Sequence, residues 1–167
     1  MELEQRPEVR RVARGALWGV VATLLMTMFM AGHLGWTAGR GGSWQSFPRL
    51  ILEQLLGRQH GVALMLSTMA AHFAYGALAG VVFAYFARPM TFAKGVGFGL
   101  FLWWILQITF VPWLGLSDFG LVHGGRFAFA TLIDHLAYGV TLGVLGAHDE
   151  TAHDATFDDL GRLQPQG

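Results

Sequence analysis

Four long apolar runs constrain this chain more than any other feature of its sequence. They cover approximately residues 15–35, 62–87, 95–116 and 126–147, and they contain almost no charged side chain. A helix that crosses a bilayer needs about 20 mostly apolar residues, so each run is long enough to span. Charged residues make up 13% of the chain, whereas an ordinary soluble domain has about 25%. The sequence therefore predicts an all-α integral membrane protein, folded as a four-helix bundle.

The segments outside these runs are polar or amphipathic. Residues 1–14 form a basic N-terminus, and residues 148–167 form an acidic tail. Between the first two runs, apolar residues recur at helical spacing over about 47–57, with Arg49 and Glu53 on the other side. This pattern predicts an amphipathic helix in the membrane interface or, alternatively, a plain helix within a connecting loop.

The distribution of Lys and Arg predicts the orientation of the bundle. Basic residues gather before the first run, in the turn between the second and third runs, and after the fourth. Because cytoplasmic loops carry an excess of Lys and Arg, both termini are expected to be cytoplasmic. The expected location is the inner (plasma) membrane of the cell, with the 47–57 helix on the extracytoplasmic side.

The second and fourth runs carry nearly the same motif. Each has a histidine, then a Tyr-Gly pair, then a further glycine; the two sets are His72, Tyr75, Gly76, Gly80 and His135, Tyr138, Gly139, Gly143. Positions four residues apart share one helix face, and small residues there allow close helix packing in lipid. Glycines also open the first and third runs. The chain is therefore expected to contain two parallel two-helix repeats, with these motifs facing the bundle interior.

His72, Asp134 and His135 are ionisable side chains near the middle of two apolar runs. Such groups are costly in lipid unless they are paired or hydrated, and they commonly mark a function. Three roles stay open. The histidines form interhelical hydrogen bonds with Tyr75 and Tyr138, or they are the two axial ligands of a b-type haem, or they form a path for protons or other ions with Asp134.

A second group of histidines is expected at the extracytoplasmic side. It comprises His33, His60 and His123, with Asp118 nearby in the sequence. Three imidazoles and a carboxylate are suitable ligands for zinc or copper. Their spacing matches no compact metal-binding motif, and histidine also occurs at membrane interfaces because it is amphipathic.

Several classes of function are disfavoured by the sequence. The chain has no cysteine and a formal net charge of zero, so we expect no thiolate metal site and no nucleic-acid partner. It contains no hydrolase triad, phosphate-binding loop or zincin motif, so enzymatic activity is not expected. The composition favours a structural or accessory subunit that contacts lipid and either other membrane proteins or a second copy of itself, with no cofactor. The alternative is a haem-binding or proton- or ion-conducting protein.

Two stretches carry a family resemblance: Phe110-Val-Pro112-Trp-Leu-Gly115-Leu and Asp134-His135-Leu-Ala-Tyr138-Gly139. They resemble the end of the small YagU-like inner-membrane proteins of bacteria. The paired His-x-x-Tyr-Gly helices are also similar to related four-helix families of unknown function. The match covers mainly residues 95–147, and it implies a four-helix membrane fold without implying an activity.

Overall fold

A computed structural model describes residues 7–38, 47–57, 61–116 and 125–162, and these residues contain helices and turns but no strand. The elements in chain order are α1 (Pro7–Ala38), α2 (Phe47–Leu56), α3 (Gly61–Phe86), α4 (Phe92–Ile105), the π turn η2 (Leu106–Phe110), α5 (Val111–Trp113) and α6 (Arg126–Arg162). The predicted all-α class is therefore confirmed for the described part of the chain.

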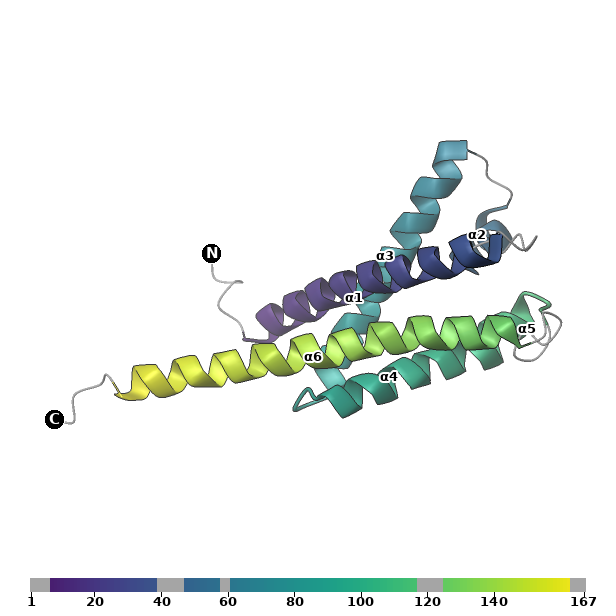
Figure 1. The fold of residues 1–167 in the computed structure, drawn as a ribbon. Helices are drawn as coiled ribbons and strands as arrows, with labels where there is room; N and C mark the ends of the chain where they lie inside the picture. Colours follow the sequence, from purple (N-terminus) through teal and green to yellow (C-terminus); the bar gives the residue numbers. More distant parts are fainter. Residues whose placement is uncertain (1–6, 39–46, 58–60, 117–124, 163–167) are drawn as a thin grey trace.

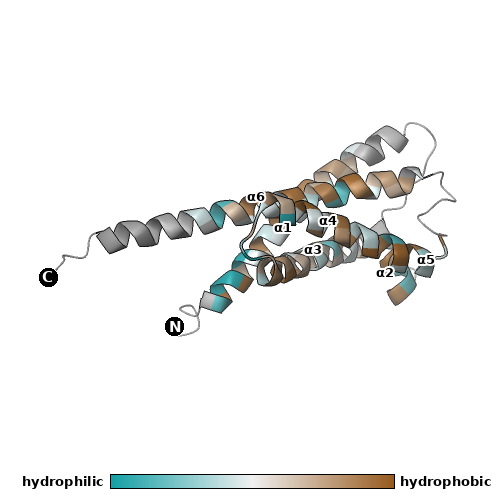
Figure 2. Ribbon diagram, turned by 90° about the horizontal axis from the view of Figure 1, so that it is seen from below, coloured by the Kyte–Doolittle hydropathy of each residue, from teal (hydrophilic) through white to brown (hydrophobic). Residues whose placement is uncertain are grey.

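Four segments are long and apolar enough to cross a membrane. They are Glu8–Gly32, Gly61–Phe86, Phe92–Trp113 and Phe127–Asp149, with lengths of 22 to 26 residues. At 1.5 Å per residue these segments are about 33 to 39 Å long, which exceeds the hydrocarbon thickness of about 30 Å. Most of their residues are hydrophobic, whereas the start of α1 is hydrophilic (Figure 2). The prediction of four apolar helices of spanning length is confirmed.

The long helices alternate in direction along the chain (Figure 1). α1 packs against both α3 and α6, and α4 packs along α6. α3 and α6 run in the same direction and contact each other only over a short stretch. We call the end where α1 begins, α3 ends and α4 begins the basic end, because it carries Arg10, Arg11, Arg14, Arg88 and Lys94.

Glycines allow the backbones of α1 and α3 to touch where the two helices cross. A Cβ atom added at Gly19 would overlap the carbonyl oxygen of Gly76, and one added at Gly80 would lie 2.7 Å from Cα of Gly19. Non-bonded carbon atoms do not approach that closely, so neither position accepts a larger residue without a shift of the helices. Beyond the crossing, the first half of α3 diverges from α1 (Figure 1) and contacts α2.

A second glycine contact joins α4 to α6. A Cβ atom added at Gly139 would lie 2.8 Å from Cα of Gly99, and one added at Gly95 would lie 2.6 Å from Cα of Gly143. Close backbone approach of this kind is a main source of helix association in lipid. The glycines of each His-Tyr-Gly motif therefore face the preceding long helix, rather than the other motif.

An apolar cluster fills the centre of the bundle. All four long helices contribute to it; its buried members are Ala22, Met26, Ala79, Phe83, Leu102, Tyr138 and Leu142. The rings of Phe83 and Phe98 pack with their centroids 5.2 Å apart. This distance is typical of favourable aromatic pairs, and the contact links α3 to α4.

The helix that begins with α4 contains one wide turn, η2. The backbone N–H of Val111 donates to the carbonyl of Leu106, five residues earlier. Pro112 follows immediately, and proline lacks the N–H that would bond the carbonyl of Ile108 in a regular helix. A π turn, which contains one more residue than an α-helical turn, accommodates the backbone hydrogen bond that is missing at the proline. The irregularity therefore lies just before Pro112.

Polar contacts fix the helix ends at the basic end. The guanidinium of Arg14 donates to the carboxylate of Asp149 at 3.0 Å, which joins α1 to α6. Thr91 caps α4, and its hydroxyl accepts from the backbone N–H of Lys94 at 3.3 Å. The ammonium of Lys94 in turn donates to the carbonyls of Arg88 and Pro89, just after α3.

Two helices extend beyond the expected spans. α1 begins at Pro7, within the predicted basic N-terminus, and α6 continues to Arg162, within the predicted acidic tail. The helix expected at 47–57 corresponds to α2, which ends at Leu56. Gly57 follows with φ of 76°, a left-handed conformation in which glycine commonly terminates helices.

Candidate functional site

A set of polar side chains is buried inside the apolar bundle. Each is less than one-tenth exposed; the set comprises Thr23, Thr68, His72, Gln107, Asp134 and His135. Three of them are ionisable, and their exposed fractions are 6% for His72, 3% for Asp134 and 5% for His135. Burial inside protein removes these side chains from lipid, which is the usual arrangement for ionisable groups in membrane helices.

A hydrogen bond between α3 and α6 sets the relative depth of the three ionisable residues. The hydroxyl of Tyr138 donates to the carbonyl of Gly76 at 2.6 Å. His72 lies four residues before Gly76, whereas Asp134 and His135 lie four and three residues before Tyr138. Because α3 and α6 run in the same direction, the backbones of all three residues lie about 5 to 6 Å along their helix axes from Gly76 or Tyr138, toward the end opposite the basic end. We call His72, Asp134 and His135 the polar layer.

The imidazole of His135 is oriented by its own helix. Its Nδ1 atom lies 2.8 Å from the carbonyl oxygen of Thr131. A carbonyl oxygen only accepts hydrogen bonds, so in the neutral ring Nδ1 carries the proton and Nε2 is the basic nitrogen. His135 therefore presents a hydrogen-bond acceptor, or a ligand atom, at Nε2.

His72 has a polar atom whose partner is absent from the described chain. Its Nε2 atom is fully buried, and no described residue hydrogen-bonds to it. The ring of Phe73 packs edge-on against the imidazole, with the centroids 6.2 Å apart. A buried polar atom without a hydrogen bond is destabilising by about 1 to 3 kcal/mol. His72 is therefore suited to a partner from outside the chain, such as a proton or a water molecule.

Gln107 continues the polar interior toward the opposite end. Its side chain is 1% exposed, and its amide nitrogen donates to the hydroxyl of Thr131 at 3.0 Å. Thr131 also supplies the carbonyl that holds His135. Trp103 lies on the same helix as Gln107 and donates from its ring nitrogen to the carbonyl of Ala128 at 3.0 Å. These contacts connect α4 and η2 to α6 beside the polar layer.

Gln107 and Thr131 are not among the site residues predicted from the sequence. Gln107 is the only amide or charged side chain in the apolar run 95–116, and it lies five residues before Pro112. An isolated amide in a spanning helix, shortly before a proline, could have identified Gln107 as a buried polar residue, because a primary amide in lipid requires hydrogen-bond partners.

The two tyrosines of the repeated motif have different surroundings. Tyr138 is 2% exposed and bonds across to α3, whereas Tyr75 is 43% exposed. The two motifs are alike in sequence, but of their two tyrosines only Tyr138 makes a hydrogen bond to another helix among the described residues.

Most of the second predicted histidine group lies outside the described residues. This applies to His60, His123 and Asp118, while His33 lies near the end of α1. Among the residues that the structure describes, no three His, Asp or Glu side chains converge as a metal-binding group. The metal site predicted at this end stays a prediction.

The chain was compared with protein-family models, with curated protein sequences and with solved structures, and no match was found. The resemblance to YagU-like proteins therefore stays a prediction, and the functional argument depends on the geometry of the site.

The polar layer is chemically suited to binding a proton. It combines a carboxyl group, an imidazole with a defined basic nitrogen and a second imidazole with an unpartnered nitrogen. Toward the basic end it is followed by the Tyr138–Gly76 hydrogen bond. Toward the opposite end, Thr131 joins His135 to Gln107.

Proposed function

We propose that this chain is a small integral membrane protein that binds and releases a proton at the polar layer, as part of proton-linked transport or sensing. The observation that carries the proposal is the burial of His72 on α3 and of Asp134 and His135 on α6, each about one helical turn from the Tyr138–Gly76 hydrogen bond. A charge at such a depth costs about 2.5 to 3.5 kcal/mol even on the most favourable scale. A site that retains three ionisable groups there is best explained by their chemistry.

Each residue of the layer has a distinct role in the proposal. Asp134 is the group that carries the proton. His135 is the proton acceptor at Nε2, because the carbonyl of Thr131 holds its other nitrogen. His72 supplies a second acceptor from α3, so protonation of the layer changes the attraction between α3 and α6.

Infrared difference spectroscopy of the reconstituted protein tests this proposal directly. We expect a carboxylic-acid carbonyl band, at the high frequency of an apolar environment, to appear as the pH is lowered and to be lost as the pH is raised. Asp134→Asn should remove the band while leaving the helical content unchanged. Asp149→Asn is the matched control, because Asp149 is an α6 carboxylate at the basic end, and it should retain the band. A wild-type spectrum without this band would reject the proposal.

The haem alternative has less support from the contacts of the bundle. A haem held by imidazoles from two helices would need open space for a flat macrocycle between those helices. The Tyr138–Gly76 bond joins α3 and α6 directly, within one turn of both histidines. A porphyrin between His72 and His135 would have to displace this contact, so we favour the proton.

We also propose that the fold consists of two parallel two-helix repeats, with both termini on the cytoplasmic side of the inner membrane. The repeat is supported by two similar glycine contacts. Gly19 of α1 packs against Gly76 of α3, and Gly99 of α4 packs against Gly139 of α6. The orientation is supported by the basic end. The accessory-subunit role stays a prediction, because no feature of the described residues identifies a protein partner.

A further inference from the structure

Three arginines at the basic end have no ion-pair partner among the described residues. They are Arg10 and Arg11 of α1 and Arg88, just after α3. Arg14 differs, because it pairs with Asp149, and Lys94 differs, because it donates to backbone carbonyls. The basic end therefore presents guanidinium groups whose charge the described carboxylates do not neutralise.

Arg11 is the most constrained of the three arginines. Its Cζ atom lies 5.4 Å from the centroid of the Tyr85 ring, within the range of a cation–π contact. Its Nε atom is buried, and no described residue accepts a hydrogen bond from it. The ring nitrogen of Trp18, two turns further along α1, is also a buried donor without a described acceptor. The site thus offers hydrogen-bond donors and positive charge but lacks an acceptor.

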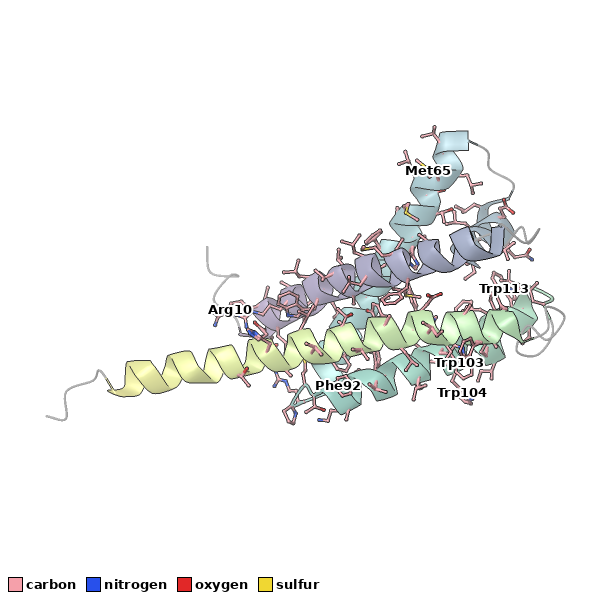
Figure 3. All side chains as sticks on the ribbon, in the orientation of Figure 1. Arg10, Met65, Phe92, Trp103, Trp104 and Trp113 are labelled. Carbon is pink, nitrogen blue, oxygen red and sulfur yellow. The ribbon has the colours of Figure 1, made fainter. Side chains whose placement is uncertain are left out.

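The three arginines lie at one level of the bundle. Gly15 of α1 contacts Gly80 and Ala84 of α3. Because α1 and α3 run in opposite directions, one turn back from Gly15 reaches Arg11, and one turn on from Ala84 reaches Arg88. Figure 3 shows Arg10 at the start of α1, at the same end of the bundle as Phe92 at the start of α4.

Large exposed aromatic side chains lie at the same end of the bundle as these arginines. Tyr85, Phe86 and Phe92 are all more than half exposed. Exposed aromatic rings at the end of spanning helices are typical of the boundary between lipid headgroups and acyl chains. The arginines therefore lie at the depth of the phosphate groups of a bilayer, rather than in open water.

We propose that Arg11, together with Arg10 and Arg88, binds the phosphate group of an anionic phospholipid. Guanidinium groups bind phosphate oxygens in a bidentate manner, and the cation–π contact with Tyr85 holds Arg11 at the end of α3. Basic sites between spanning helices are suited to anionic headgroups. The adjoining aromatic side chains favour a lipid over free phosphate, because they contact the acyl region. This inference is independent of the proton-binding proposal.

Thermal unfolding of the full-length protein in neutral detergent tests the inference. Phosphatidylglycerol, phosphatidylcholine or inorganic phosphate is titrated at constant ionic strength, and an apparent Kd is obtained from the rise in Tm. Of these three ligands, we expect only phosphatidylglycerol to raise Tm strongly. Arg11→Gln and Arg88→Gln should each weaken its apparent binding about fivefold, the effect of one basic residue near an anionic surface.

Two further variants make the experiment decisive. Arg126→Gln removes one positive charge at the start of α6, at the opposite end, and should change the apparent Kd less than twofold. Arg10 is exposed, so Arg10→Gln keeps the test available if the Arg11 variant does not fold. Equal effects of phosphatidylglycerol and phosphatidylcholine, or unchanged binding by the variants, would overturn the inference. Full protection by inorganic phosphate would assign the site to a free anion and would reject the lipid.

Discussion

Tyr138 and Tyr75 are matched positions that allow a single hydroxyl group to be tested. Tyr138→Phe removes the hydrogen bond to the carbonyl of Gly76. We expect it to lower the free energy of unfolding by about 0.6 to 1.7 kcal/mol, the range measured for interhelical hydrogen bonds in membranes. Tyr75→Phe should have almost no effect, because that side chain is 43% exposed. Stability in mild detergent under added denaturant measures both, and equal losses would contradict the assigned contact.

At the residue scale, sequence reasoning located the ionisable residues of the polar layer but not their surroundings. His72, Asp134 and His135 were identifiable because charged or imidazole groups are rare in apolar runs. The roles of Thr131 and Gln107 depend on the register between α4 and α6. That register results from the packing of glycines on two helices, which no local pattern specifies.

At the scale of helices, two glycines of α4 provide a matched pair for the packing argument. A Cβ atom at Gly95 would clash with the backbone of α6, whereas one at Gly97 would meet no atom within 4 Å. We expect Gly95→Ala to destabilise the fold by about 1 to 3 kcal/mol through overpacking. Gly97→Ala should be neutral or stabilise it by up to about 1 kcal/mol, because alanine favours helix over glycine. The denaturation midpoint of each variant measures the difference.

If Gly95→Ala and Gly97→Ala proved equally stable, close backbone packing of α4 on α6 would be excluded. Gly32 of α1 offers a second control, because it also has open space around it. Its substitution by alanine should resemble that of Gly97 rather than that of Gly95.

The sequence predicted the existence of the four spanning helices but not the way they pair. Hydropathy and length define each apolar helix separately. The repeated motif indicated glycine faces, yet it did not specify that Gly76 and Gly80 face α1. Nor did it predict the π turn, because a proline in a spanning helix is accommodated in several ways, and neighbouring contacts decide among them.

At the scale of the whole molecule, the orientation can be tested with single cysteines, since the chain has none of its own. Gln54 of α2 and Arg88 after α3 are both exposed, at opposite ends of the bundle. With the basic end inside the cell, Gln54→Cys should react with a membrane-impermeant maleimide added to intact cells. Arg88→Cys should react only after the membrane is made permeable. The reverse pattern would invert the proposed topology, and with it the leaflet of the lipid site.

The length of α6 has a mechanical consequence. The helix runs without a break from Arg126 to Arg162, and it carries two of the three ionisable residues of the polar layer. The distance along the helix axis from Asp134 to Arg162 is about 42 Å, of which roughly 20 Å lies beyond the span that ends at Asp149. If α6 tilted as a rigid body by about 10° about Asp134, Arg162 would move by about 7 Å. A change of charge in the polar layer that tilted α6 would therefore move the end of the helix that lies outside the membrane.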